Sequence, residues 1–354
     1  MTAFIERAYR VYFQTPAFLG DADQKAQWRT PPIKALLREW WRIRVAKQFG
    51  YDVEKIRAEE LSIFGAAADA GSSQQSRLRL RLSQWDSGNF DAKANLDSIK
   101  IPTGNFQVSI GSYLAYGPYQ KGIGSKALPP GPQAAHRLEL RLRTDGLNRT
   151  PEEVMGWIDD AVALAHRFGT LGSRSRNGWG SVSLIPYDAA SAKPVKWDNV
   201  QRQLADCMKE DWPHAIGIDE KGLLVWRTRG SYSDWKAALR DLALARQKIN
   251  RFGIENPKNP REDGLRLRHM LSYPVTKHDK PGWSNQMRLP SQLRFKVLSN
   301  NNSFYGIIVH VPTRCALELP LDPSQQAVIW SKVHGQINSI PTFRRLNPNE
   351  IQEF

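Results

Sequence analysis

A glycine-rich segment with two arginines, residues 169–180, reads G-T-L-G-S-R-S-R-N-G-W-G. Glycine permits positive φ angles and lets a ligand approach backbone N–H groups closely. Arg174 and Arg176 carry forked donors that match phosphate oxygens, and Trp179 offers a ring on which a base can stack. These residue types point to a phosphate-bearing ligand. The candidate contact residues are Gly169, Gly172, Ser173, Arg174, Arg176, Asn177, Gly178 and Trp179.

The position of this segment argues against a nucleotide cofactor. A helix is expected before Gly169 and a strand over residues 181–187. Dinucleotide and Walker loops run the other way, from a strand into a helix whose N-terminus holds phosphate. A Walker loop also needs G-K-S/T, which this chain lacks. The alternative to a phosphate site is a flexible turn with solvated arginines, in which Trp179 only closes the core.

The charge of the whole chain favours nucleic acid as the ligand. Lys and Arg number 50 against 35 Asp and Glu, a formal net charge of +15 over 354 residues. The cations recur along the whole chain, often beside aromatics, which indicates basic folded surfaces. An anionic membrane and a simple solubility role are the alternatives.

The sequence also indicates a compartment. It shows no signal peptide and no apolar run long enough to span a membrane. Cys207 and Cys315 lie far apart and match no zinc or redox spacing. We therefore expect a reduced, cytoplasmic protein that does not contact a membrane.

A predicted helix near the N-terminus supplies a second basic group. The T-P-P sequence at 30–32 is typical of a helix start, with Thr30 as the cap. Lys34, Arg38 and Arg42 then fall four residues apart on one face, where they can follow a phosphate backbone. An ordinary amphipathic helix with a solvated basic face explains the same pattern.

Two further regions are basic or aromatic. Residues 77–82 and 137–143 alternate leucine with arginine, which predicts two strands that share an arginine-rich face without aromatics of their own. RNA can lie across such a face, but a solvated face or one packed on another subunit fits as well. Residues 111–124 are rich in tyrosine and glycine, and Tyr116 could stack on RNA. A disordered loop is the alternative there.

Residues suited to catalysis are sparse. A metal-independent ribonuclease often uses histidine as acid or base, but none of the seven histidines precedes His136. His166 lies near the end of an apolar helix pattern, and we interpret it as structural. Asp21 and Asp23 are the best acidic pair, yet a turn or a helix cap explains them. The sequence therefore predicts no catalytic residue, no metal and no cofactor.

The elements that must position these residues fall into two units. Strands at 5–13, 77–82, 137–143 and 181–187 alternate with helices at 30–50 and 151–168. Thr150 and Glu153 have capping-box spacing at the second of these helices. A shorter helix is expected at 54–64. The order strand, helix, strand, strand, helix, strand is the α+β ferredoxin-like, or RRM-like, βαββαβ unit.

The second half repeats this order less regularly. Residues 188–196 have Ala, Ser and Pro character and read as a linker, so we expect domains at 1–187 and 197–354. Strands are predicted at 222–228, 265–275, 292–298 and 304–311, and helices at 232–250 and 323–338. No final strand is evident after the last helix. The prediction is a divergent second ferredoxin-like domain.

Several segments resemble RAMP proteins. They are T-P-A-F-L-G-D-A-D-Q at 15–24, R-T-P-P-I-K-A-L-L-R-E-W-W-R at 29–42, E-L-S-I-F-G at 60–65, Y-L-A-Y-G-P at 113–118 and R-L-P-S-Q-L-R-F-K-V at 288–297. In this order, with the glycine-rich segment, they are similar to the first subunit of the Cmr complex, the type III-B CRISPR effector. The resemblance spans residues 5–298 and is weaker in the second half.

The resemblance implies a fold of two ferredoxin-like domains and a non-catalytic subunit at the 3′ end of the guide RNA. It implies contact with guide RNA or single-stranded target RNA, and with neighbouring RAMP subunits, in antiviral defence. The family's helix-start and loop positions fall on Thr30, Lys34, Arg38 and residues 169–180. The second half has no second glycine-rich loop of this type. A guide-processing endoribonuclease on the same fold and a purely structural capping subunit are the alternative functions.

Overall fold

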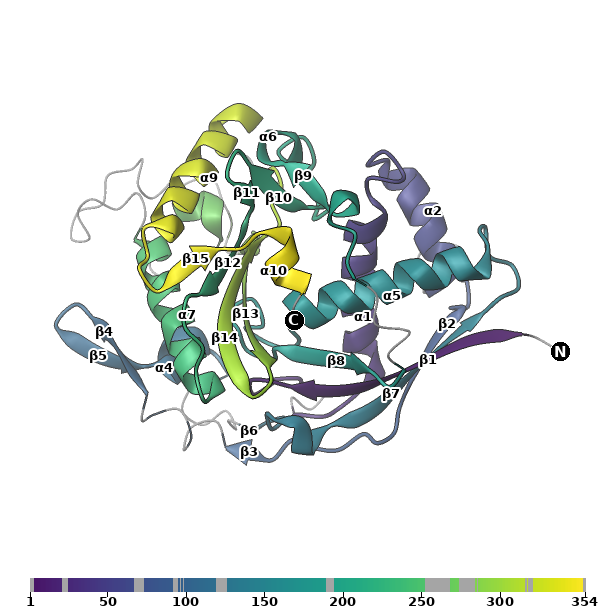
Figure 1. Ribbon diagram of the computed structural model, residues 1–354, viewed down its shortest axis with the longest axis horizontal. Coiled ribbons are helices and arrows are strands. Elements are labelled where there is room, and N and C mark those ends of the chain that lie inside the picture. The colour runs from purple at the N-terminus through teal and green to yellow at the C-terminus, as the bar shows by residue number, and fades with distance from the viewer. Residues whose placement is uncertain are drawn as a thin grey trace.

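The structure of the chain is a computed structural model (Figure 1). It describes residues 3–20, 25–66, 73–91, 95, 97, 99–118, 126–188, 194–251, 268–273, 284, 286–315, 317 and 321–352. Two four-stranded sheets lie side by side, the first toward the N-terminus and the second toward α7 and α9 (Figure 1). Each sheet is covered by helices, so the molecule has the α+β architecture that the sequence predicts.

The first sheet has the strand order β2-β7-β1-β8, and every neighbouring pair is antiparallel. Alternating residues of β7 are buried, which places its leucines against the helices and its arginines outside. This confirms the predicted βαββαβ unit. Its strands are β1 (Phe4–Phe13), β2 (Leu78–Leu82), β7 (His136–Arg143) and β8 (Val182–Pro186), and its helices are α1 (Thr30–Val45), α2 (Val53–Phe64) and α5 (Pro151–Phe168).

The helix starts agree with the sequence in part. At α5, the Thr150 side chain accepts a bond from the backbone N–H of Glu153, as predicted. At α1, Thr30 is the first helical residue rather than the cap, and Arg29 stands at the cap position without a side-chain bond. Proline in the first turn removes an N–H that would lack a helical partner, so α1 begins there without a polar cap.

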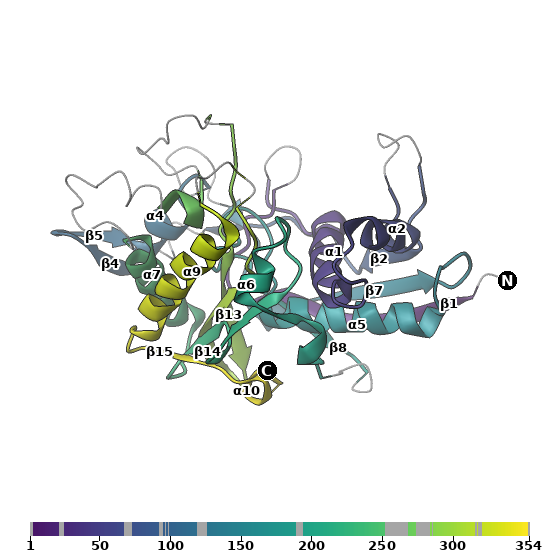
Figure 2. The ribbon, with the colours of Figure 1, turned by 90° about the horizontal axis from the view of Figure 1, so that it is seen from above.

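The second sheet has the strand order β13-β14-β12-β15, which is the same path through space as the first. Helices α7 and α9 pack against each other, and α7 also packs on the sheet, as Figure 2 shows from above. The half therefore has the ferredoxin-like topology in full. Its elements are β12 (Val225–Thr228), α7 (Trp235–Asn250), β13 (Leu293–Asn300), β14 (Ser303–His310), α9 (Pro323–Asn338) and β15 (Phe343–Arg345).

Three predictions for this half were wrong. A final strand exists, but β15 has three residues and buries only Phe343, too short for a visible alternation. The predicted strand at 222–228 is divided between β11 (Gly222–Leu223) and β12, which belong to different sheets. Residues 268–271 are helical where a strand was predicted, and the rest of that prediction, apart from residues 272 and 273, lies outside the described residues.

Shorter elements fill the connections. A three-stranded sheet combines β11 with β9 (Gln201–Gln203) and β10 (Ile216–Asp219). Small helices are α4 (Ile110–Leu114), α6 (Leu204–Cys207) and α10 (Pro348–Gln352), with 3₁₀ turns at Pro132–Ala134 and Trp197–Asn199. Two strand pairs lie between β2 and β7: β3 (Phe90–Asp91) with β6 (Lys126–Ala127), and β4 (Lys100–Thr103) with β5 (Phe106–Ser109).

The connection between β2 and β7 packs on the other half of the molecule. Both ribbon views place α4 beside α7, and Gln247 of α7 donates to the carbonyl of Pro102 at 2.7 Å (Figures 1 and 2). Ile101, Ile110 and Leu114 are buried in the same core as α7. This long connection is therefore an ordered bridge between the halves over its described residues.

A buried lysine ties the two sheets together. Lys296 of β13 is fully buried, and the three N–H groups of its ammonium are within hydrogen-bonding distance of four backbone carbonyls, those of Ala165 at 3.1 Å, Gly169 at 2.9 Å, Val182 at 2.7 Å and His166. The last carbonyls of a helix lack helical partners and carry partial negative charge, which a lysine can satisfy. Burial lowers the pKa of Lys296 well below its usual value. The C-terminus of α5 is thus anchored to the second sheet.

No helix among the described residues is long and apolar enough to cross a membrane. Cys207 and Cys315 are buried and form no disulfide.

Candidate nucleic-acid interface

The glycine-rich segment 169–180 lies at the junction of the two sheets. Gly172 has φ of +93°, and a Cβ there would lie 2.7 Å from the carbonyl oxygen of Phe18. Gly180 has φ of +59°, and a Cβ there would lie 1.9 Å from the carbonyl oxygen of Leu171. The neighbouring Ser173 N–H donates to Phe18 at 2.9 Å. At both positions glycine is needed for close backbone packing within the protein.

The second part of this segment is buried. Trp179 has no exposed surface and packs edge-on against Phe18, with ring centroids 5.4 Å apart. Asn177 is buried and donates to the carbonyl of Leu114 at 2.7 Å, and Gly178 is buried beside Leu239. The predictions that Trp179 stacks on a base and that Asn177 and Gly178 contact RNA are therefore wrong. These three residues instead pack against or hydrogen-bond to other parts of the protein at the junction of the two sheets.

Arg176 is also engaged inside the protein. Its guanidinium donates to the carbonyl of Ser291 at 2.5 Å and lies 4.0 Å from the carboxylate of Glu39. Burial lowers the pKa of Arg176 to about 10. Glu39 in turn pairs with Arg294 at 2.7 Å. Although burial alone raises the pKa of Glu39, the two arginines lower it overall. The predicted role of Arg176 as a free phosphate ligand is not supported by these contacts.

Arg174 and Tyr116 form the exposed tip of the segment. Arg174 has φ of +57° and is exposed, and its Nε donates to the carbonyl of Tyr116 at 2.7 Å. One of five guanidinium N–H groups is used in this bond. The Tyr116 ring is 55% exposed, which leaves it open for stacking. Gly172 and Ser173 lie on the surface beside Arg174, whereas Gly169 is buried. The structure thus brings together a cation, an aromatic ring and small polar residues.

The basic face of α1 is largely neutralised by a carboxylate. Arg38 and Arg42 both form ion pairs with Glu60 of α2, and Arg38 also donates to the carbonyl of Gly65 at 3.0 Å. Lys34 is partly buried, and burial together with Arg38 lowers its pKa to about 8. Thr30 is half-buried at the start of the helix. The sequence pattern located the three cations correctly but gave no sign of Glu60, the partner of the two arginines, which lies 18 or more residues further along the chain.

Two hollows flank the exposed side of α1. The first, about 420 Å³, lies between Pro32, Arg42, the segment 170–175 and Trp212-Pro213 of the second half. The second, about 390 Å³, is lined by Lys34, Arg38 and the end of α2. Ala35 lines both, so they adjoin across the helix. Trp212 and Pro213 were missed in the sequence because only the folding of the second half brings them here.

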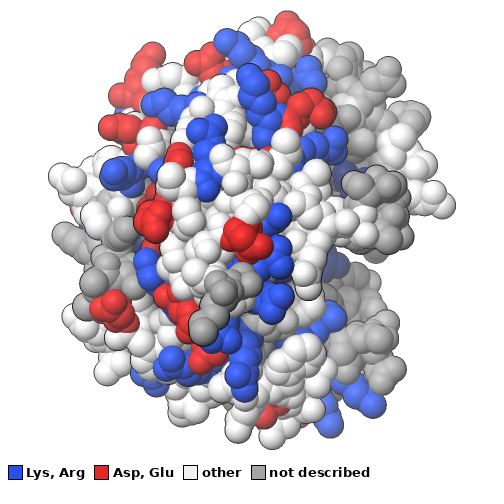
Figure 3. Space-filling model, turned by 90° about the vertical axis from the view of Figure 1, so that its right-hand side faces the viewer, with Lys and Arg blue, Asp and Glu red and all other residues white. Residues whose placement is uncertain are grey.

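The arginine-rich face of the first sheet contains aromatics after all. Arg79 and Arg141 lie over the ring of Phe4, which is 39% exposed, and Arg137 lies over Tyr187, which is 55% exposed. These rings come from β1 and the end of β8, so the arginine rows alone did not reveal them. Arg137 and Arg141 also pair with glutamates, and positive and negative side chains are interspersed at this end of the molecule (Figure 3).

The residues considered for catalysis do not form a site. His166 accepts a bond from the Leu184 N–H at 3.1 Å, and burial lowers its pKa to about 3, as a structural histidine requires. Asp21 and Asp23 lie outside the described residues. Within the described part of the chain, no group of three or more His, Cys, Asp or Glu residues could hold a metal ion.

Comparisons with known proteins show one family match, in the first half of the chain. Residues 10–183 match the family model of the RAMP superfamily. The matched part of the chain contains α1 and the glycine-rich segment. No curated protein sequence matches the chain at a significant level.

Solved structures extend the likeness to the whole chain. Cmr1 from Pyrococcus furiosus, in its apo form, has a TM-score of 0.53 at 16% identity and covers 96% of this chain and 98% of its own. A chain of the Type III-B Cmr-beta bound to cognate target RNA and AMPPnP has a TM-score of 0.53 at 12% identity, covering 95% and 100%. A chain of the Type III-B Cmr-beta bound to cognate target RNA has a TM-score of 0.50 at 13% identity, and the match covers 95% of this chain and 100% of that one. The chain therefore has the fold of type III-B Cmr subunits.

Proposed function

We propose that this chain is a non-catalytic RNA-binding subunit of a type III-B CRISPR (Cmr) effector ribonucleoprotein, located in the cytoplasm. It sits at the guide-RNA 3′ end, contacts guide or target RNA, and packs on other RAMP subunits. The observation that carries the proposal is the exposed Arg174–Tyr116 pair beside the hollows along α1. The fold shared with chains of target-RNA-bound Cmr-beta supports it.

The structure narrows the residues that this function would use. Phosphate contacts fall to Arg174 and Lys34, which have no carboxylate partner among the described contacts. Tyr116 supplies the stacking ring, while Gly172 and Ser173 offer a close backbone surface. Arg38 and Arg42 add positive potential at the two hollows, reduced by Glu60.

The test is a filter-binding titration of single-stranded RNA at several salt concentrations. Arg174→Ala with Lys34→Ala should weaken binding and lower the slope of log K against log salt by about 0.7 for each lost phosphate contact. Arg57→Ala with Lys332→Ala removes two exposed cations elsewhere and is the matched control. Equal affinity and slope for the two double variants would contradict the proposal.

The two alternatives make different predictions. A guide-processing endoribonuclease would cleave repeat RNA at one position without metal, yet no histidine lines either hollow among the described residues. A purely structural capping subunit would meet acidic protein through its basic surfaces, and RNA would then fail to compete for the isolated chain.

A further inference from the structure

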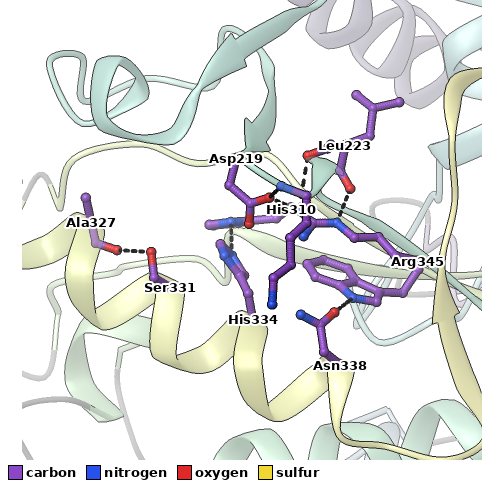
Figure 4. A network of polar contacts seen from close by, with 11 residues as sticks. Asp219, Leu223, His310, Ala327, Ser331, His334, Asn338 and Arg345 are labelled. Atoms are coloured by element: carbon purple, nitrogen blue, oxygen red, sulfur yellow. Dashed lines mark hydrogen bonds and ion pairs between the residues drawn. The ribbon is translucent and has the colours of Figure 1, made fainter.

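A pocket of about 430 Å³ lies in the second half, far in sequence from the glycine-rich segment. One wall is a face of α9 that includes Ser331, His334 and Gly335, and the other includes Asp219 and Glu220 at the end of β10. Figure 4 shows Asp219, His334 and Arg345 close together between the strands and α9. The proposed RNA interface uses none of these residues.

A chain of hydrogen bonds fixes the tautomer of His334. The Gln292 amide is oriented by Thr313, because its Nε2 donates to the Thr313 carbonyl at 2.8 Å and its Oε1 accepts from the Thr313 N–H at 2.9 Å. His310 Nε2 lies 3.3 Å from that Oε1 and so must carry the proton. His310 Nδ1 is then an acceptor, and His334 Nε2, 2.9 Å away, must donate to it.

The consequence is a buried acceptor without a partner on a residue that lines the pocket. With its proton on Nε2, His334 presents a lone pair at Nδ1, and this atom has no hydrogen-bond partner among the described residues. His334 is 2% exposed, and burial lowers its pKa to about 3, so it stays neutral near pH 7. A buried acceptor without a partner costs free energy that a donating ligand would recover.

The charges at the pocket select the kind of donor. Asp219 and Glu220 line it together with one cation, Lys221. Asp219 already pairs with Arg345 at 2.9 Å, whereas Glu220 is exposed. A phosphodiester would meet carboxylates and an acceptor nitrogen, which disfavours RNA. Val328 at the rim is 55% exposed and offers apolar contact for the stem of a long side chain.

We propose that this pocket binds an arginine or lysine side chain presented by a protein partner. The cation would donate to His334 Nδ1 and face Glu220, while its methylene stem lies on Val328. Charge-assisted bonds of this kind are stronger than neutral ones, and carboxylates nearby favour a cation over a neutral donor. The site is separate from the proposed RNA contacts, so either proposal can fail without the other.

The experiment follows the ¹⁵N signals of the His334 ring in the full chain. The probe is N-acetyl-arginine methylamide, compared with N-acetyl-leucine methylamide and uridine 5′-monophosphate. Gly335→Leu fills the pocket without a clash, because nothing lies within 4 Å of a Cβ there, and leucine favours the helix over glycine. Gly156→Leu in α5 is the matched control, since its Cβ position is equally open.

The arginine probe should shift the His334 signal in the natural chain and in Gly156→Leu, and the shift should be lost in Gly335→Leu. A shift of the same size with the leucine probe, or with the arginine probe in Gly335→Leu, would overturn the proposal. So would the absence of any shift. A shift by uridine 5′-monophosphate alone would assign the pocket to a nucleotide instead.

Discussion

Single residues in the segment 169–180 divide between exposed and buried positions. Arg174 stands at the surface with Tyr116, while Trp179 and Asn177 are buried in the junction. The division follows the order of the chain, because Ser173 and Arg174 are exposed whereas residues 177–180, with positive φ at Gly178 and Gly180, are buried. The same segment therefore contributes an exposed arginine to the surface and buried side chains to the junction between the two sheets.

A substitution of Trp179 tests whether this ring has a structural role. Trp179→Ala removes a fully buried ring and should lower the free energy of unfolding by about 3–5 kcal/mol, measured by urea unfolding. The RNA affinity of the folded fraction should stay unchanged. If the variant instead lost RNA affinity at unaltered stability, Trp179 would be a stacking residue and the packing account would be wrong.

Among the elements, α1 and α2 act as a pair. Two of the three arginines of α1, Arg38 and Arg42, pair with Glu60 of α2, and each of these arginines lines one of the two hollows beside α1. The ion pairs orient the helices and at the same time reduce the positive potential next to the proposed RNA path. Because Arg38 and Arg42 are paired with Glu60, they can add less to the proposed affinity for RNA than two unpaired arginines would.

Removing the charge of Glu60 should increase the positive electrostatic potential at Arg38 and Arg42. Glu60→Gln should raise affinity for single-stranded RNA by about 1 kcal/mol, roughly fivefold, because Arg38 and Arg42 become available to phosphate. Glu54→Gln, an exposed change of equal charge on the same helix, should have a smaller effect. Filter binding at low salt compares them, and equal gains would show that only net charge matters.

The whole molecule is one packed body made of two similar halves. The hydrophobic core that contains α1 and α5 also includes Ile307 and Val309 of β14, and Trp179 is buried in the core of the second half. Lys296 reinforces this union at the end of α5. The predicted domain limits of 1–187 and 197–354 remain a prediction, but each of the two cores contains residues from both sides of that boundary.

Buried histidines should make the stability of this body depend on pH. Burial lowers the pKa of His166 and His334 to about 3 and of His214 to about 4, and that of His310 well below its usual value. Unfolded histidine titrates near 6.5, so the unfolded chain binds more protons below that pH. Stability should be full above about pH 6.5 and fall as the pH drops toward 4.

Urea unfolding between pH 7.5 and 5.5 measures this dependence, in a range where most carboxylates stay ionised. Each buried histidine contributes a slope of up to about 1.4 kcal/mol per pH unit below its unfolded pKa. His214→Gln should reduce the slope of stability against pH by the contribution of one buried histidine. Constant stability down to pH 5.5 would contradict the burial of these rings.

The sequence by itself determined the first βαββαβ unit, the positions of α1 and α5, and the basic character of the chain. These features are local, since hydrophobic periodicity, proline at helix starts and charge are all contained in neighbouring residues. The short strand β15 carries too few residues for such a signal and was missed.

Only the tertiary structure decided which cations and rings are available. Glu60 neutralises Arg38 and Arg42, Ser291 and Glu39 engage Arg176, and the second half covers Trp179. Each of these contacts joins residues far apart in the chain. Burial and ion pairing depend on what folding brings against a side chain, and the periodicity of its own element carries no record of that partner.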